Sequence, residues 1–136
     1  MAEYEYRLRP IGRVESRITE RAGAPRQGDE GAPPAWLVFE PEVERGLREL
    51  TVGAELLVLT WLHRARRDVL AVRPRGEAGR PETGVFATRS PDRPNPIGLH
   101  RVTVLAVDGL RVRVSDLEAL DGTPVLDLKP VLTGER

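Results

Sequence analysis

The sequence predicts a strand-dominated domain, a β-barrel or a β-sandwich, with one short helix. Short runs of alternating or continuous apolar residues recur along 136 residues and are separated by turns rich in glycine (13 residues) and proline (12 residues). The runs do not alternate with helical patterns, which argues against a parallel sheet. The dipeptide Asp108-Gly109 joins two alternating runs, 101–107 and 110–114, and predicts a β-hairpin.

The N-terminal part is predicted to be a strand followed by a long loop. Between Tyr4 and Ser16, apolar and charged residues alternate with a period of two, as in a strand with one buried face. The composition of 17–34 then changes to glycine, proline and charged residues. A loop of this length inside a domain is either functional or disordered, and this one contains Arg26 and Gln27.

A short helix is expected from Glu42 to Leu50. Pro41 suits the start of a helix, and Val43, Leu47 and Leu50 form an apolar stripe. The next run, 55–63, is almost continuously apolar, so it resembles a strand buried on both faces or lying at a protein contact. Short strands are also expected at 68–73 and, after the turn at Asp121-Gly122, at 125–128.

The segment Gly84 to Leu99, GVFATRSPDRPNPIGL, is the most informative stretch of the chain. It contains three prolines, which exclude a helix and favour an extended, stiff loop over 90–96. We expect 84–88 to be a strand that leads into this loop and Ile97 to begin the next strand. The loop is either a rigid binding element that offers guanidinium and amide groups or a crossover that only turns a corner.

Composition excludes several classes of protein. There are 21 basic and 21 acidic residues and no cysteine, so the sequence offers no strongly basic surface, disulfide, thiolate nucleophile or cysteine-bound zinc. It contains no glycine-rich phosphate-binding motif and no metal-binding motif, and we expect no metal. A lone histidine such as His63 or His100 is more often structural than catalytic. Without a leader or a membrane span, the protein is expected to be soluble and cytoplasmic.

Four segments carry a resemblance to a known family. Pro25-Arg26-Gln27, Trp61-Leu62-His63, the segment 84–99 and LDGTPVLDLKP (120–130) occur in the order found in the N-terminal domain of the tRNA methyltransferase O family. The resemblance extends from Ile11 to Pro130. It implies a small closed or partly open β-barrel, unrelated to Rossmann-type methyltransferases, that binds S-adenosyl-L-methionine and forms a homodimer. It also implies methylation of N6 of threonylcarbamoyladenosine beside the tRNA anticodon.

The resemblance also implies which residues contact the cofactor. Arg89 or Arg26 can pair with the methionine carboxylate, Leu99 can form an apolar wall, and backbone groups near 118–120 can hold the adenine edge. The expected cofactor-binding residues are Arg26, Gln27, His63, Arg64, Arg89, Leu99, Leu117, Glu118, Ala119 and Leu120.

Two residues of the stiff loop are expected to act on the methyl acceptor. We hypothesise that Asn95 orients the acceptor nitrogen and that Arg93 anchors the nucleic-acid backbone; alternatively, the Asn95 amide ties the backbone of its own loop. Asp92 stands where some members of the family have an aromatic residue.

Longer members carry a C-terminal domain that helps to hold tRNA, and this sequence stops at Arg136. We therefore expect one domain over 1–136 without the second. Two functions stay open: a methyltransferase acting on tRNA or on a smaller substrate, and a module that binds S-adenosyl-L-methionine without catalysis. The absence of a recognisable acid/base pair does not exclude an enzyme, because aligned reactants can supply much of the rate of methyl transfer.

Overall fold

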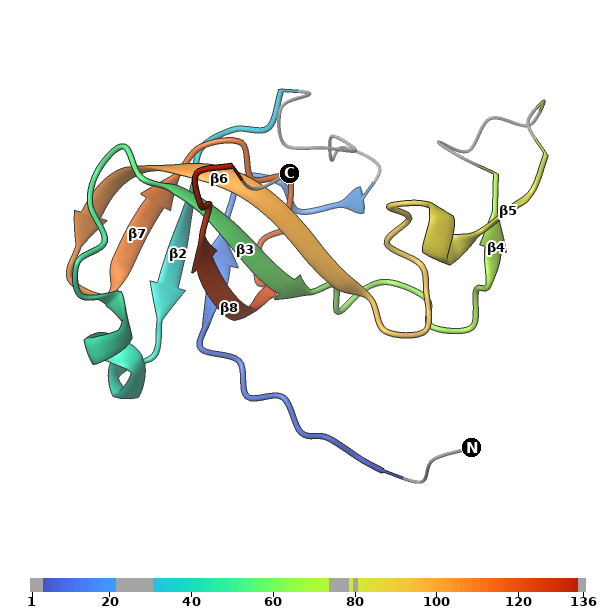
Figure 1. Cartoon of the computed structure of the whole chain (residues 1–136), viewed down its shortest axis with the longest axis horizontal. Helices are drawn as coiled ribbons and strands as arrows, with labels where there is room; N and C mark the ends of the chain where they lie inside the picture. Colours follow the sequence, from blue (N-terminus) through green and yellow to red (C-terminus); the bar gives the residue numbers. More distant parts are fainter. Residues whose placement is uncertain (1–3, 22–30, 74–78, 80, 135–136) are drawn as a thin grey trace.

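Six antiparallel strands close into a barrel in the computed structural model, which describes residues 4–21, 31–73, 79 and 81–134 (Figure 1). The order around the barrel is β1-β2-β7-β6-β3-β8, and pairing of Gly12 in β1 with Val125 in β8 closes the ring. The bounds are β1 Gly12–Glu15, β2 Ala35–Phe39, β3 Glu55–Trp61, β6 Ile97–Asp108, β7 Arg111–Val114 and β8 Pro124–Pro130. The predicted fold, a mainly β barrel with a short helix, is confirmed.

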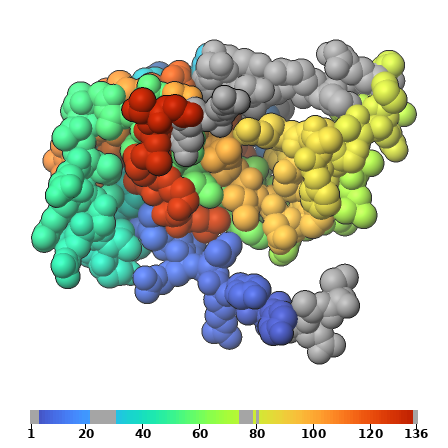
Figure 2. All heavy atoms as spheres, in the orientation of Figure 1, coloured from blue at the N-terminus to red at the C-terminus, as the bar shows by residue number. Residues whose placement is uncertain are grey.

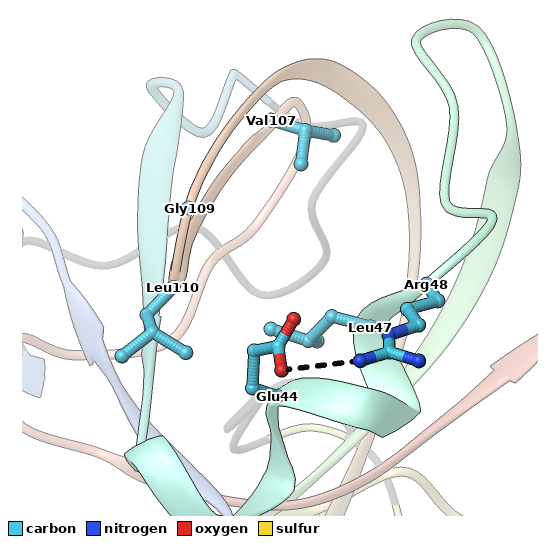
Figure 3. Close-up of a pocket in the computed structure, with 6 residues that line it drawn as sticks. All are labelled: Glu44, Leu47, Arg48, Val107, Gly109 and Leu110. Atoms are coloured by element: carbon cyan, nitrogen blue, oxygen red, sulfur yellow. Dashed lines mark ion pairs between the residues drawn. The ribbon is translucent and has the colours of Figure 1, made fainter.

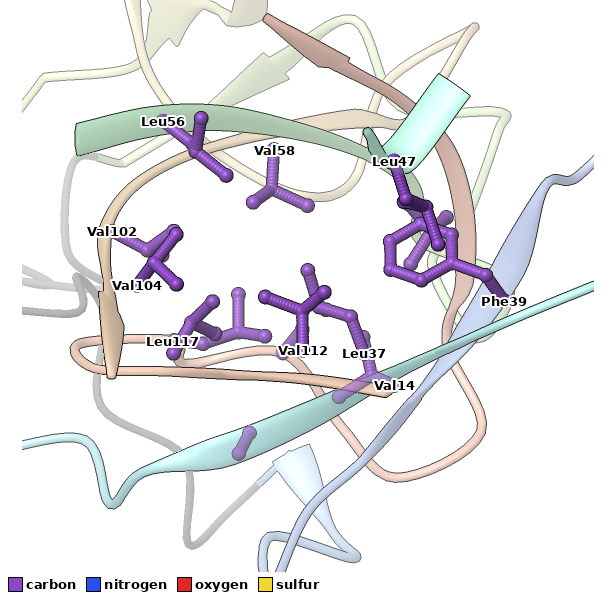
Figure 4. Close-up of a cluster of buried hydrophobic side chains, with 14 residues drawn as sticks. Val14, Leu37, Phe39, Leu47, Leu56, Val58, Val102, Val104, Val112 and Leu117 are labelled. Carbon is purple, nitrogen blue, oxygen red and sulfur yellow. The ribbon is translucent and has the colours of Figure 1, made fainter. Parts of the chain in front are cut away.

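The core fills the inside of this barrel. Inward and outward positions alternate along each strand, as the period of two requires, and the inward side chains meet in the enclosed space (Figure 4). The buried cluster is almost purely aliphatic: Val14, Ala35, Leu37, Phe39, Leu47, Leu56, Val58, Val102, Val104, Val112, Val114, Leu117, Ala119 and Val125. This core of mostly branched apolar side chains supplies the rigid base for the loops at either end.

The N-terminal strand is shorter than predicted. The residues from Tyr4 to Pro10 extend away from the barrel without strand pairing, and Tyr6 is 85% exposed (Figure 1). The ladder starts at Gly12, where a side chain would be impossible because an added Cβ would lie 2.4 Å from the Val38 carbonyl oxygen. The alternating residues from Tyr4 to Leu8 therefore form no strand, because they pair with no neighbouring strand of the barrel.

β2 is a strand that the sequence pattern does not predict. Ala35, Leu37 and Phe39 point inward, and the strand pairs with β1 on one side and with β7 on the other. The run is only five residues long and follows two prolines. It is nevertheless required, because the ring cannot close without it.

The predicted helix exists but is a 3-10 helix. This element, η3 (Pro41–Leu47), begins at the proline as expected. It ends three residues earlier than predicted because Arg48 is extended and Glu49 takes a positive φ of 73°. Leu47 is buried and closes one end of the core.

The chain between β3 and β6 forms a lobe beside the barrel (Figures 1 and 2). It contains the two-stranded pair β4 (Ala71–Val72) and β5 (Thr83–Gly84) and the 3-10 helix η5 (Val85–Ala87). The expected strand over 84–88 is thus wrong after Gly84, because Val85 to Ala87 form a tight turn that buries Val85. The start of β6 at Ile97 and the hairpin between β6 and β7 are confirmed.

Candidate functional site

The stiff loop that leads into β6 is braced from within by Arg93. The Arg93 guanidinium donates to the carbonyl oxygens of Val85 and Thr88, the latter at 2.6 Å. The Thr88 hydroxyl donates to the Val85 carbonyl (2.9 Å) and accepts from the Ser90 backbone N–H (3.1 Å). Arg93 Nε is buried and has no hydrogen-bond partner among the described residues. These contacts favour a loop-building role for Arg93, and its contact with nucleic acid stays a prediction.

A second arginine, Arg67, holds the loop from outside. Arg67 Nε donates to the Pro94 carbonyl oxygen (2.7 Å), and Arg67 Nη2 donates to Asn95 Oδ1 (3.1 Å). The guanidinium also lies over the Trp61 ring, 5.1 Å from its centroid. Since a guanidinium can only donate, the atom of Asn95 that faces it is the amide oxygen. The amide nitrogen of this exposed residue makes no hydrogen bond to the described residues and can donate to a ligand.

Asp92 connects the loop to two other segments. It accepts from the Arg66 backbone N–H (2.8 Å) and from the Arg21 guanidinium (3.1 Å). Partial burial acts to raise the pKa of Asp92, but the hydrogen bonds from Arg21 and from the Arg66 backbone outweigh it and hold the pKa below its usual range. Asp92 thus ties the loop to the segments that carry Arg21 and Arg66 through charge and hydrogen bonds.

The predicted cofactor residues near the junction of β3 and β6 are exposed. β3 ends at Trp61, so His63 lies in the following turn and not in the strand expected over 55–63. Arg64 donates to the Thr19 carbonyl oxygen (2.8 Å). Arg89 is exposed and makes no hydrogen bond or ion pair within the described parts of the chain, and Leu99 is 44% exposed on the outer face of β6. Arg26 and Gln27 lie outside the described residues.

The segment 117–120 lies beside the same end of the barrel as the lobe. Leu117 and Ala119 are buried in the core, so their side chains cannot reach a ligand and only their backbone groups could do so. Glu118 points differently: its carboxylate accepts from His100 Nδ1 at 2.6 Å and its side chain is 18% exposed. Leu120 is partly buried.

Behind Glu118 lies a buried polar chain that sequence reasoning missed. His100 is 4% exposed on the inner face of β6, and its Nε2 lies 2.7 Å from the hydroxyl of Thr60, which is fully buried on β3. One signal was available: in ELLVLTW, alternation places Thr60 on the same inward face as Leu56 and Val58. A hydroxyl on an apolar inner face needs a partner.

The predicted residues that the structure describes thus fall into two groups, one in the lobe and one at the barrel end where β3 ends and β6 begins. The lobe carries the loop residues Arg89, Arg93 and Asn95, and the barrel end carries Glu118 next to His100. Among the described residues, no group of His, Cys, Asp and Glu is arranged to hold a metal ion. None of the helices found there has the length and apolar character of a membrane span.

An open pocket at the other end of the barrel contains none of these residues. It lies between η3 and the β6–β7 hairpin and is lined by Glu44, Leu47, Arg48, Val107, Gly109 and Leu110 (Figure 3). Its charged groups already pair with each other, at 3.7 Å between Glu44 and Arg48. Neither the position nor the chemistry of this pocket connects it to the candidate site.

Comparisons with known proteins agree on one relationship. Residues 13–134 match the family described as the tRNA-methyltransferase O N-terminal domain. A protein of Methanothermobacter thermautotrophicus, named a probable S-adenosyl-L-methionine-binding protein, is 44% identical over 130 residues, which cover 96% of this chain and 93% of the relative. An S-adenosyl-L-methionine-binding protein of Archaeoglobus fulgidus is 44% identical over 90% of this chain and 86% of its own length.

The fold is similar to that of a solved structure. The crystal structure of TrmO from Pseudomonas aeruginosa superposes with a TM-score of 0.76 at 29% sequence identity. The alignment covers 95% of this chain and 57% of that protein. This chain therefore spans somewhat more than half of the TrmO chain that it matches.

Proposed function

The chain belongs to the tRNA-methyltransferase O N-terminal domain family, and from this premise we propose that it is a methyltransferase that uses S-adenosyl-L-methionine. The proposed acceptor is N6 of threonylcarbamoyladenosine next to the tRNA anticodon. When bound, the cofactor supplies an electrophilic methyl group on its sulfonium sulfur. The protein must then bind the cofactor and hold the acceptor nitrogen in line with that methyl group.

One structural observation carries the proposal: a braced loop offers two unused donors. Within the described parts of the chain Arg89 has no partner, and Asn95 uses only its amide oxygen, which accepts from Arg67, so its amide nitrogen makes no hydrogen bond there. A free guanidinium suits the methionine carboxylate, which it can bind through two parallel hydrogen bonds. Bracing by Arg93 and Arg67 means that little order has to be gained on binding.

The remaining cofactor contacts are proposed around this loop. Arg26 and Gln27, together with His63 and Arg64, are proposed to hold the methionine part with Arg89. Leu99 offers an apolar wall, because nearly half of its side chain is exposed on β6. The backbone of 117–120 is proposed to hold the adenine edge. A nucleoside held in this way lies between the lobe and the barrel end.

Asn95 is proposed to orient the methyl acceptor. Its free NH2 group can donate to a carbonyl oxygen of the acceptor, such as that of the threonylcarbamoyl group. This assignment would leave the acceptor nitrogen free to attack the methyl carbon, with the N–C bond forming as the S–C bond breaks. The electron pair of the S–C bond would stay on sulfur in S-adenosylhomocysteine, and the N6 proton would be released to solvent. The contacts of Arg93 support an indirect part, in which it shapes the loop that carries Asn95 and Arg89.

A homodimer is also proposed. Ile97 and Leu99 are each 44% exposed on the outer face of β6, next to the half-buried outward residues Leu57, Leu59 and Trp61 of β3. Such a contiguous apolar strip next to a binding loop is typical of a contact between subunits. A second copy would cover the strip and lie close to the proposed cofactor.

The names of the relatives favour a second candidate, a module that binds S-adenosyl-L-methionine without transferring a methyl group. The two are separated by incubating the protein with labelled S-adenosyl-L-methionine and tRNA from cells that lack the N6 methyl group. Label in N6-methylated threonylcarbamoyladenosine, recovered after digestion to nucleosides, supports the methyltransferase. The matched control is tRNA without the threonylcarbamoyl group, which should stay unlabelled.

The binding module predicts saturable cofactor binding and no label in either tRNA. Label in both tRNAs would exclude the proposed acceptor. No binding and no label would exclude both functions.

A further inference from the structure

A buried chain of three polar side chains links the inside of the barrel to its lobe end. Thr60 Oγ1 lies 2.7 Å from His100 Nε2, and His100 Nδ1 lies 2.6 Å from Glu118 Oε1. The hydroxyl is fully buried, the imidazole is 4% exposed and the glutamate side chain is 18% exposed. The chain thus runs from the dry interior outward and ends in a carboxylate.

An ionised carboxylate fixes the direction of the hydrogen bond between His100 Nδ1 and Glu118. An ionised carboxylate can only accept, so Nδ1 carries the imidazole proton and donates it to Glu118. In the neutral ring Nε2 is then an acceptor, and the Thr60 hydroxyl donates to it. Both ring nitrogens are satisfied, and the ring is held between two partners.

The backbone of β6 is adapted to this arrangement at Gly98. A Cβ at this position would lie 2.3 Å from Thr60 Oγ1 and 2.6 Å from His100 Nε2. A glycine is therefore required for the hydroxyl and the imidazole to meet. The order of groups is that of a hydrolase triad, but Thr60 is fully buried and cannot attack a substrate.

We propose that His100 is a positioning residue that aims the Glu118 carboxylate at the nucleoside of the cofactor, an inference that rests on the proposed function. His100 occupies Oε1, and Oε2 has no hydrogen-bond partner among the described residues. The Glu118 side chain is 18% exposed, whereas its sequence neighbours Leu117 and Ala119 are buried, so Glu118 is the one of the three whose side chain can offer an acceptor to a ligand. The group that it binds is a hydrogen-bond donor of the nucleoside, an amino or a hydroxyl group.

Two substitutions of His100 separate positioning from mere packing. The amide nitrogen of asparagine reaches the place of Nδ1, so His100→Asn keeps a donor to Glu118; that of glutamine reaches the place of Nε2, so His100→Gln does not. With S-adenosylhomocysteine as the calorimetric probe, we expect His100→Asn to keep its affinity within about threefold. His100→Gln should bind about tenfold more weakly or worse, because the carboxylate is no longer held by a charge-assisted hydrogen bond.

Two further substitutions test the groups on either side of His100. Glu118→Gln keeps an oxygen for Nδ1–H but turns the outer acceptor into a donor, and it should also lose about tenfold in affinity or more. Thr60→Val removes the inner hydrogen bond but leaves the contact between His100 and Glu118, so it should lower the melting temperature and weaken binding by less than His100→Gln does. A purely structural triad predicts the opposite: affinity that follows melting temperature across all four variants.

The imidazole can also be tested without any ligand. Nitrogen-15 NMR of the protein should show His100 as the Nδ1–H tautomer, in the unsubstituted chain and in Glu118→Gln alike. The Nε2–H tautomer would overturn the proposal. So would full affinity in both His100→Gln and Glu118→Gln, and that result would leave the proposed function standing. Failure of the unsubstituted protein to bind S-adenosylhomocysteine would instead reject the proposed function, and with it the ligand-facing role of Glu118.

Discussion

Replacing Gly98 by alanine tests the tightest contact in the barrel. The added Cβ would meet Thr60 Oγ1 at 2.3 Å, His100 Nε2 at 2.6 Å and Leu62 Cδ2 at 3.1 Å. Real Cβ atoms do not approach other atoms this closely, so either β3 or the His100 side chain has to move. Overpacking of a core costs about 1 to 3 kcal/mol. Leaving a buried polar partner unsatisfied costs about another 1 to 3 kcal/mol.

We therefore expect Gly98→Ala to lower the free energy of unfolding by about 2 to 6 kcal/mol. The assay is urea unfolding at fixed protein concentration, read as a change in midpoint at constant slope. Gly84→Ala is the matched control, because its added Cβ meets nothing within 4 Å, and it should change stability by less than about 0.5 kcal/mol.

A double mutant tests whether the clash with Thr60 causes this loss of stability. In a Thr60→Ala background the closest clashing atom is absent, so Gly98→Ala should cost less than it does alone, by about 1 kcal/mol or more. A cost below about 1 kcal/mol for Gly98→Ala alone, or strictly additive costs in the double mutant, would refute the packing described here.

Four further predictions follow from the site and the core. Arg67→Ala should keep S-adenosylhomocysteine affinity but lower the turnover of methyl transfer about tenfold, because Asn95 loses its charged hydrogen bond. Arg66→Ala is the control, because its backbone N–H still reaches Asp92. Equal losses of turnover in both variants would contradict the role of Arg67. Because the folded-state pKa of Asp92 is depressed, its contribution to stability is complete above the unfolded pKa of about 3.9 and is lost as pH falls through the folded pKa. The melting temperature of Asp92→Asn should therefore converge with that of the unsubstituted protein at low pH. A constant difference in melting temperature at every pH would contradict this role of Asp92. Leu37→Ala should lower the free energy of unfolding by about 2 to 5 kcal/mol in urea, since Leu37 is fully buried in the core, and a loss below about 1 kcal/mol would show that the core is described wrongly. Light scattering at micromolar concentration with ligand present should give twice the mass of one chain, and a single-chain mass would exclude the dimer.

Local sequence patterns were sufficient for the elements that local chemistry determines. The hairpin at Asp108-Gly109 forms because the dipeptide suits a tight turn between alternating strands, and η3 begins at Pro41 because proline suits the first helical position. The alternation of Tyr4 to Leu8 was misleading, since a period of two predicts a strand only where a neighbouring strand exists to pair with it. Ring closure depends on such pairings and is not visible in any one segment.

The candidate site was predictable only in part, for the same reason. The prolines and arginines of 89–96 mark a stiff polar loop, but the brace from Arg67 joins residues 28 positions apart. His100 appeared to be a lone histidine because its partners lie 40 and 18 positions away in the sequence. The hydrogen-bonded chain of Thr60, His100 and Glu118 is thus formed by the closing of the barrel and not by a motif.

Calorimetric titration with S-adenosylhomocysteine tests the central claim most directly, because every proposed role depends on a nucleoside bound between the lobe and the barrel end. The account predicts one ligand per chain and an affinity at least about tenfold lower in Arg89→Ala, since the ligand carboxylate would lose a bidentate charged contact. Arg101→Ala is the control, because this arginine pairs with Glu55 at 2.8 Å away from the loop, and it should bind like the unsubstituted protein. No saturable heat from the unsubstituted protein, or full affinity in Arg89→Ala, would contradict the account.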